Sequence, residues 1–262
     1  MHPQIAKTVD SVAQQVEHNT FNVGVLGSSP SRVTALEISL LRLISFFYPT
    51  TSQKQSPKTG ISSLFLYFCR SIMVSIFDDM TQVTEAEVQH MLPLVDEQRR
   101  NEALRYKHLF GQFACLKSWL MLKELLAPLN INEMEMDFNE HGKPFLAHHP
   151  EVHFNLSHCK NGIAVVVDSS PVGIDIESFR RSNLSLIEKT MNPVETEQIF
   201  TSSDPVEAFT QYWTMKEAVL KLRGTGIVND LHHVLDGKGY LLETHVIREK
   251  RYAYSIAYHT VQ

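Results

Sequence analysis

A chain of 262 residues is long enough for one large domain or two small ones. Its hydrophobic content of 43% and charged content of 20% are those of an ordinary globular protein. The three cysteines show no paired spacing, which argues against a disulfide framework and fits a cytoplasmic location. The formal net charge of −5 excludes a global basic field that would attract nucleic acid.

Residues 1–72 differ from the rest of the chain. Their apolar runs at 36–48 and 61–68 are shorter than the ~20 residues that span a bilayer, and the pattern of a signal peptide is absent. The segment 12–34 resembles the conceptual translation of a tRNA gene. We therefore expect 1–72 to be a non-native, poorly ordered extension ahead of a start at Met73. A membrane-surface anchor is the alternative.

After residue 72, the sequence predicts one strand and then helices. Residues 73–77 alternate weakly, as a strand does, and a capping box that begins at Thr84 predicts a short helix. A long helical pattern runs over 96–126, with a break expected near Gly111. Its expected buried stripe consists of Phe113, Leu116, Leu120, Met121 and Leu125.

Short strands are predicted at 133–138, 152–156 and 163–168, with turn residues at 139–142 between the first two. Five histidines lie between positions 141 and 158, which raises the possibility of a zinc site. The sequence has neither a Cys pair nor a His-Glu-x-x-His helix, which argues against zinc.

The segment Gly173-Ile174-Asp175-Ile176-Glu177 alternates along a predicted strand. The two isoleucines point to one face, and Asp175 and Glu177 point to the other. Two neighbouring carboxylates repel each other unless something positive lies between them, and Mg²⁺ prefers such oxygen ligands. The alternative is an exposed strand face beside a basic partner.

The sequence predicts one helix at 205–223, because Asp204 can cap its start and Gly224 can end it. Glu217 and Lys221 are four residues apart and lie opposite the core-facing stripe of Met215, Ala218, Val219 and Leu222. The simplest interpretation of Glu217 and Lys221 is a solvated ion pair. Helices are also expected within 184–200, with a break at Pro193, and strands at 239–246 and 251–259.

Two stretches together resemble a family signature. Gly173-Ile-Asp-Ile-Glu177 is followed by Trp213-Thr-Met-Lys-Glu-Ala-Val-Leu-Lys-Leu-Arg-Gly-Thr-Gly226, and Phe154-Asn-Leu-Ser-His158 and Gly142-Lys-Pro144 precede them in order. This arrangement resembles the 4′-phosphopantetheinyl transferase superfamily, of the surfactin-synthetase-activating type. The resemblance implies an α+β fold of two pseudo-symmetric halves, 73–170 and 171–262, packed around a coenzyme A cleft.

The resemblance also implies a Mg²⁺-dependent reaction. The 4′-phosphopantetheine group of coenzyme A would be transferred to a serine hydroxyl of an apo acyl or peptidyl carrier protein, with release of adenosine 3′,5′-bisphosphate. Asp175, Glu177 and Glu217 would bind the metal, and Glu217 and Lys221 would be catalytic. Coenzyme A would be bound by Arg105, Lys107, Lys143, Pro144, Ser157, His158, Lys216 and Lys221.

Carrier proteins of this kind are acidic around the modified serine. Residues 1–72 hold six of the 24 basic and three of the 29 acidic residues, so 18 basic and 26 acidic residues leave 73–262 with a net charge of −8. A local basic patch is therefore expected at Arg180, Arg181 and Arg223. We expect a monomer with neither a nucleic-acid nor a membrane partner.

Two alternatives remain open at this point. A Mg²⁺-dependent phosphohydrolase or nuclease could use the same carboxylates and Lys221, although the basic stripe of a nuclease is absent. A binding module could keep the fold without catalysis, but the intact set of Asp175, Glu177, Glu217 and Lys221 argues against that.

Overall fold

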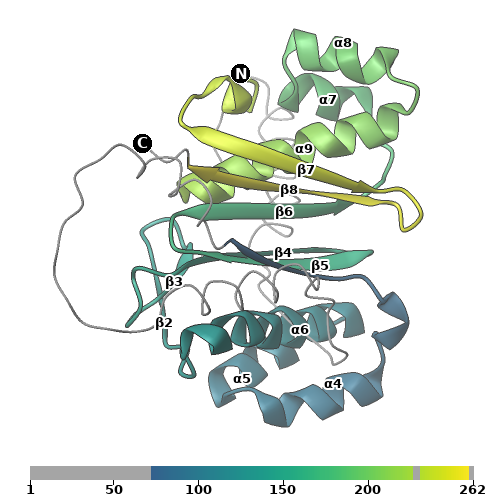
Figure 1. Ribbon diagram of the computed structural model, residues 1–262. Coiled ribbons are helices and arrows are strands. Elements are labelled where there is room, and N and C mark those ends of the chain that lie inside the picture. Colours follow the sequence, from purple (N-terminus) through teal and green to yellow (C-terminus); the bar gives the residue numbers. More distant parts are fainter. Residues whose placement is uncertain (1–71, 227–230, 260–262) are drawn as a thin grey trace, which may run out of the picture.

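The computed structural model of the protein describes residues 72–226 and 231–259 (Figure 1). The expected extension, 1–72, lies outside these ranges except for Ile72. Within the described ranges, none of the helices combines the length and apolar character that a membrane span requires. The chain mixes helices with antiparallel sheets, which confirms the predicted α+β class.

Two three-stranded antiparallel sheets form the centre of the molecule. The first has the strand order β1-β5-β4, with strands at Met73–Phe77, Gly162–Asp168 and His153–Cys159. The second has the order β6-β8-β7, with strands at Val172–Ser178, Tyr252–His259 and Tyr240–Ile247. A separate hairpin pairs β2 with β3, at Met136–Phe138 and Pro144–Leu146.

Helices cover the outer faces of both sheets (Figure 1). On the first sheet lie α4, α5 and α6, at Glu85–Met91, Glu97–Arg105 and Leu109–Leu126. On the far side of the second sheet lie α7, α8 and α9, at Leu184–Thr190, Pro193–Thr201 and Pro205–Arg223. Short 3₁₀ turns at Met80–Gln82, Leu92–Leu94, Ala127–Leu129 and Val234–Asp236 complete the described elements.

Strand β5 lies between two hydrophobic cores. Its residues Ala164 and Val166 join the cluster between the two sheets. Ile163, Val165 and Val167 join the cluster under α4 and α6. Because both faces of β5 are buried, its sequence is a continuous apolar run and does not alternate.

The predicted break in the 96–126 helical pattern is present, but it lies at 106–108, a few residues before Gly111. Helix α5 ends at Arg105 and α6 begins at Leu109, so Gly111 lies inside α6. The glycine is required for packing, because a Cβ at this position would lie 2.8 Å from Cδ1 of Tyr106. Of the expected α6 stripe, Leu120 and Leu125 are only partly buried, whereas Phe113, Leu116 and Met121 belong to the core.

Helix α9 begins and ends where its capping residues predict. Asp204 accepts hydrogen bonds from the backbone N–H groups of Val206 and Glu207, and Gly224 ends the helix with φ of 65°. Glu207, in the first turn of the helix, accepts two hydrogen bonds from the Arg248 guanidinium.

Gly173 lets α9 pack directly on β6. A Cβ at this position would lie 2.1 Å from the carbonyl oxygen of Ala218 and 2.4 Å from the backbone nitrogen of Leu222. We expect Gly173→Ala to lower the free energy of unfolding by about 3 kcal/mol or more. The atoms that the new methyl group would meet belong to the helix backbone, which cannot move aside as a flexible side chain can. Urea unfolding checks this.

The matched control is Gly162→Ala. A Cβ at Gly162 would meet mainly the mobile Cδ1 of Ile176, at 2.8 Å, with the nearest backbone atom at 3.4 Å. This variant should therefore be clearly more stable than Gly173→Ala. Equal stability of the two variants would contradict the direct helix-on-strand contact.

Candidate active site

Strand β6 presents two carboxylates to helix α9. Ile174 and Ile176 are buried in the cluster between the sheets, so the alternating Asp175 and Glu177 face the other way. Asp175 is only 5% exposed. The alternation predicted from the sequence is confirmed, but Asp175 does not lie on an exposed strand face.

Helix α9 turns Glu217 and Lys221 toward these carboxylates. Glu217 is 5% exposed and the Lys221 side chain 9%, so the two do not form a solvated surface pair. Their burial follows from the close approach of α9 to β6 at Gly173. A helix face that looks polar in the sequence is thus covered by the strand beside it.

A hydrogen-bonded group joins Lys221, Asp175 and Ser157. Lys221 Nζ lies 2.7 Å from Asp175 Oδ1 and donates to Ser157 Oγ at 3.0 Å. Ser157 in turn donates to the same carboxylate oxygen at 2.8 Å. The ammonium group is thereby held against Asp175, while Asp175 Oδ2 is buried without a hydrogen-bond partner in the described part of the chain.

The remaining two carboxylates hold protons more tightly than usual. Burial, and then the charge of Asp175, raise the pKa of Glu177 to about 7 and that of Glu217 to about 7. One ammonium group therefore faces three acidic side chains. Such a cluster favours an additional cation, although no three His, Cys, Asp or Glu side chains in 72–226 or 231–259 form a ready-made metal cage.

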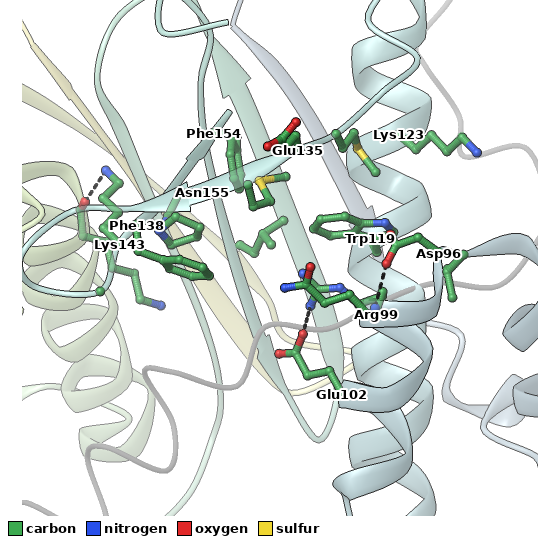
Figure 2. A pocket seen from close by; sticks show the side chains of 18 of the residues that line it. Asp96, Arg99, Glu102, Trp119, Lys123, Glu135, Phe138, Lys143, Phe154 and Asn155 are labelled. Atoms are coloured by element: carbon green, nitrogen blue, oxygen red, sulfur yellow. Dashed lines mark hydrogen bonds and ion pairs between the residues drawn. The ribbon is translucent and has the colours of Figure 1, made fainter. Parts of the chain in front are cut away.

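A cavity of about 800 Å³ opens beside this cluster (Figure 2). Glu217 and Lys221 contribute to its wall from α9. Figure 2 shows Lys143 and Phe138 at one end and Asp96, Arg99 and Trp119 at the other. The lining also includes Pro144, Asn155, Met134, Met136, Glu133 and Glu135. Its size and its mixture of apolar and charged groups suit an extended, charged small molecule.

The expected phosphate contacts Ser157 and His158 lie beside the cavity and do not form its lining. Ser157 is engaged with Asp175, as described above. The His158 ring stacks on Phe110, with ring centroids 5.8 Å apart. Burial, and then the charge of Lys221, lower the pKa of His158 to about 4, so the imidazole is neutral at pH 7 in this structure.

Lys216, another expected coenzyme A contact, points toward a different element. Its Nζ lies 2.8 Å from Glu195 Oε2 on α8 and donates to the carbonyl oxygen of Leu231 at 2.8 Å. The buried ion pair joins α9 to α8. Adjacent positions of α9 thus hold Glu217, which lines the cavity, and Lys216, which pairs with α8.

The cationic residue that lines the cavity near α5 is Arg99. Its guanidinium stacks 3.8 Å from the Trp119 ring and pairs with Glu102 at 3.0 Å. Arg105 and Lys107, expected to hold a phosphate of coenzyme A, are exposed and do not line the cavity. Helical spacing is the sequence signal that indicates Arg99, because Arg99 lies on the same inward face of α5 as the buried Ala103, four residues later.

Comparison with known proteins finds a family whose model matches the segment that carries this site. Residues 171–256, which carry the three carboxylates and Lys221, match the family model described as the 4′-phosphopantetheinyl transferase superfamily.

Curated relatives extend the similarity beyond this segment. The 4′-phosphopantetheinyl transferase psf-1 of Bacillus pumilus is 31% identical over 148 residues, which are 54% of this chain and 63% of the relative. The 4′-phosphopantetheinyl transferase Sfp of Bacillus subtilis (strain 168) is 23% identical over 150 residues, 55% of this chain and 67% of the relative. The chain therefore spans about two thirds of the length of these relatives. The resemblance seen in the sequence is confirmed: the chain is related to the Sfp-type members of the 4′-phosphopantetheinyl transferase superfamily, which are enzymes of the transferase class.

Proposed function

We propose that the chain transfers the 4′-phosphopantetheine group from coenzyme A to a serine of an apo acyl or peptidyl carrier protein. The observation that carries this proposal is the convergence of Asp175, Glu177, Glu217 and Lys221 beside the cavity, whose wall includes Glu217 and Lys221. Three acidic groups and one ammonium are the residue types that a reacting pyrophosphate requires, because a cation must offset its charge.

The carboxylates fit a divalent cation, and we propose Mg²⁺. Asp175 Oδ2, which has no hydrogen-bond partner among residues 72–226 and 231–259, would supply one oxygen. Burial and the charge of Asp175 raise the pKa of Glu177 and that of Glu217, and a bound cation would stabilise the charged form of both. These three side chains would hold the ion through oxygen ligands. When bound, Mg²⁺ would neutralise negative charge on the pyrophosphate.

In the proposed reaction the serine oxygen of the carrier attacks the β-phosphorus of coenzyme A. A phosphorus–oxygen bond forms to serine, and the bond from the β-phosphorus to the bridging oxygen breaks. The bridging oxygen leaves with adenosine 3′,5′-bisphosphate. Glu217, or a water that it orients, accepts the serine proton, and Lys221 stabilises the charge on the leaving phosphate.

We place coenzyme A in the cavity between the two proposed halves, 73–170 and 171–262. Its lining residues come from both sides of that boundary, which supports this placement. The cations of its lining are Arg99, Lys123, Lys143 and Lys221, and Pro144 forms part of its wall. We further propose that the enzyme is a cytoplasmic monomer whose partners are coenzyme A and the carrier, with no nucleic acid or membrane.

Intact mass spectrometry tests the proposal. The full chain is incubated with coenzyme A, Mg²⁺ and one of several apo carrier proteins. We expect the carrier to gain one phosphopantetheine group. Breakdown of coenzyme A without a carrier would instead favour the phosphohydrolase, and an unchanged carrier together with intact coenzyme A would favour a binding module.

Two exposed arginines follow β6 and form the proposed docking site for the acidic carrier. Arg180 and Arg181 lie outside the cavity, and the charge of Arg180 reaches Glu177. We expect the double variant Arg180→Glu/Arg181→Glu to raise KM for the carrier about tenfold or more and to leave KM for coenzyme A unchanged, because like charges repel an acidic partner.

Steady-state kinetics with each substrate varied in turn measure this effect. Lys160→Glu, which reverses an exposed charge at the β4–β5 turn, is the control. Unchanged carrier kinetics in the double variant would remove these arginines from the docking site.

A further inference from the structure

We propose that Lys143 is a positioning residue, which ties strand β6 to the end of helix α9 and so fixes Lys221 against Asp175. The effect on catalysis rests on the proposed function, whereas the structural connection does not. The resemblance of Gly142-Lys143-Pro144 to a nucleotide-contacting segment predicts a different role, direct contact of Lys143 with coenzyme A.

The turn of the β2–β3 hairpin presents Lys143 rigidly. The Asn139 side chain accepts hydrogen bonds from the backbone N–H groups of His141, at 3.0 Å, and Lys143, at 2.8 Å. The backbone N–H of Asn139 donates to the carbonyl of Lys143 at 3.0 Å. Gly142 allows this geometry with φ of 81°. The Lys143 side chain therefore leaves a defined turn.

Lys143 Nζ contacts the two elements that carry the reactive groups. It donates to the carbonyl oxygen of Lys221 at 2.6 Å and to that of Val172 at 3.2 Å. Val172 begins β6, which carries Asp175, and Lys221 lies in the last turn of α9. One ammonium group therefore bridges the strand and the helix whose side chains must meet.

The end of a helix is a favourable place for this cation. The last carbonyls of α9 lack partners within the helix, and the helix dipole is negative there. Asn139 adds a second connection, since its Nδ2 donates to the carbonyl oxygen of Gly224 at 3.0 Å. A Cβ at Gly224 would lie 3.1 Å from Lys143 Cδ, so the glycine that ends the helix also leaves room for the hairpin.

The ammonium of Lys143 faces the protein backbone, which distinguishes it from Lys221. Burial, and then the charge of Lys221, lower the pKa of Lys143 to about 8. Two of its three N–H donors are used by carbonyl oxygens. Lys221, by contrast, reaches the carboxylate of Asp175. The two lysines thus have different tasks, one structural and one directed at the reacting groups.

Kinetics of Lys143→Met and Asn139→Ala test the proposal, with the exposed Lys160→Met as control. With the full chain, Mg²⁺ and an apo carrier, we expect kcat to fall about tenfold or more in Lys143→Met, since small misplacements of catalytic groups carry large costs. KM for coenzyme A should change little. Asn139→Ala should lower kcat in the same direction, although it removes no charge. A raised KM for coenzyme A in Lys143→Met, with normal kcat in both variants, would mean direct contact and overturn the proposal.

The double variant Lys143→Met/Lys221→Met separates the two roles further. If Lys143 acts through Lys221, the double variant should be no slower than Lys221→Met alone. Additive losses would overturn the proposal, because they would show that Lys143 acts on the substrate independently.

Hydrogen exchange measured by mass spectrometry tests the connection without any activity. Lys143→Met should increase exchange over residues 215–224, at the end of α9, relative to Lys160→Met. Unchanged exchange would overturn the proposal whether or not the enzyme is active. Failure of the wild-type chain to modify any carrier, with exchange increased in the variant, would overturn only the proposed function.

Discussion

Asp175→Asn is expected to abolish phosphopantetheine transfer while the protein stays folded. The carboxylate is the centre of the cluster, because one oxygen accepts from Lys221 and Ser157 and the other is buried without a partner in the described ranges. Asparagine keeps the shape of the side chain but removes its charge. We expect kcat to fall by about 10³, the scale on which one preorganised electrostatic group acts.

The same substitution should leave stability nearly unchanged. It removes the negative charge that pairs with Lys221, which destabilises, but the same charge repels Glu177 and Glu217. Thermal unfolding measures the balance. Mg²⁺ should raise the melting temperature of the wild type but not that of Asp175→Asn, since one ligand is lost.

Asp137→Asn is the matched control for this experiment. Asp137 is exposed on the β2–β3 hairpin, where its carboxylate accepts a local hydrogen bond from the backbone N–H of Phe138. We expect wild-type transfer and a normal response to Mg²⁺. Transfer at the wild-type rate in Asp175→Asn would remove Asp175 from the proposed metal site.

The local signals in the sequence predict the elements that carry the site. Asp204 and Gly224 mark both ends of α9, and the alternation around Asp175 gives the inward and outward faces of β6. Helix caps and strand alternation depend on residues that are close together in the sequence, so a local stretch of sequence is enough to predict them. The motif around Glu217 also marks the helix that contributes Glu217 and Lys221 to the cavity wall.

The sequence does not predict side-chain contacts between different elements of the fold. Nothing near Lys216 indicates that its partner is Glu195 on another helix, and nothing near Gly111 indicates that Tyr106 packs against it. Strand β3 was missed because its three residues, Pro144–Leu146, are too short for an alternating pattern. Long-range packing, which decides these cases, leaves little trace in a local window.

Glu217→Gln is expected to make the protein more stable above neutral pH and catalytically inactive. In the folded protein the pKa of Glu217 and that of Glu177 are raised from 4.5 to about 7, by burial and by Asp175. The folded state therefore binds these protons more tightly than the unfolded chain does. By linkage, the free energy of unfolding falls as the pH rises from about 4.5 through about 7.

Glutamine at position 217 removes one of the buried charges that form in this pH range. At pH 8 and without divalent cations, we expect the free energy of unfolding of Glu217→Gln to exceed that of the wild type by on the order of 3 kcal/mol, since one pKa unit corresponds to about 1.4 kcal/mol. At pH 5 the two proteins should be nearly equal, because most Glu217 is then protonated. Urea unfolding at both pH values measures this, with the exposed Glu249→Gln as control.

A stabilised but inactive Glu217→Gln would show that the negative charge of this cluster is maintained at a cost in stability, as is common for residues selected for catalysis. Mg²⁺ should remove the difference at pH 8, because a bound cation offsets the same repulsion in the wild type. If the wild type and Glu217→Gln lose stability equally between pH 5 and pH 8, the raised pKa of Glu217 is not the source of the pH dependence, and the electrostatic basis of the proposed metal site fails.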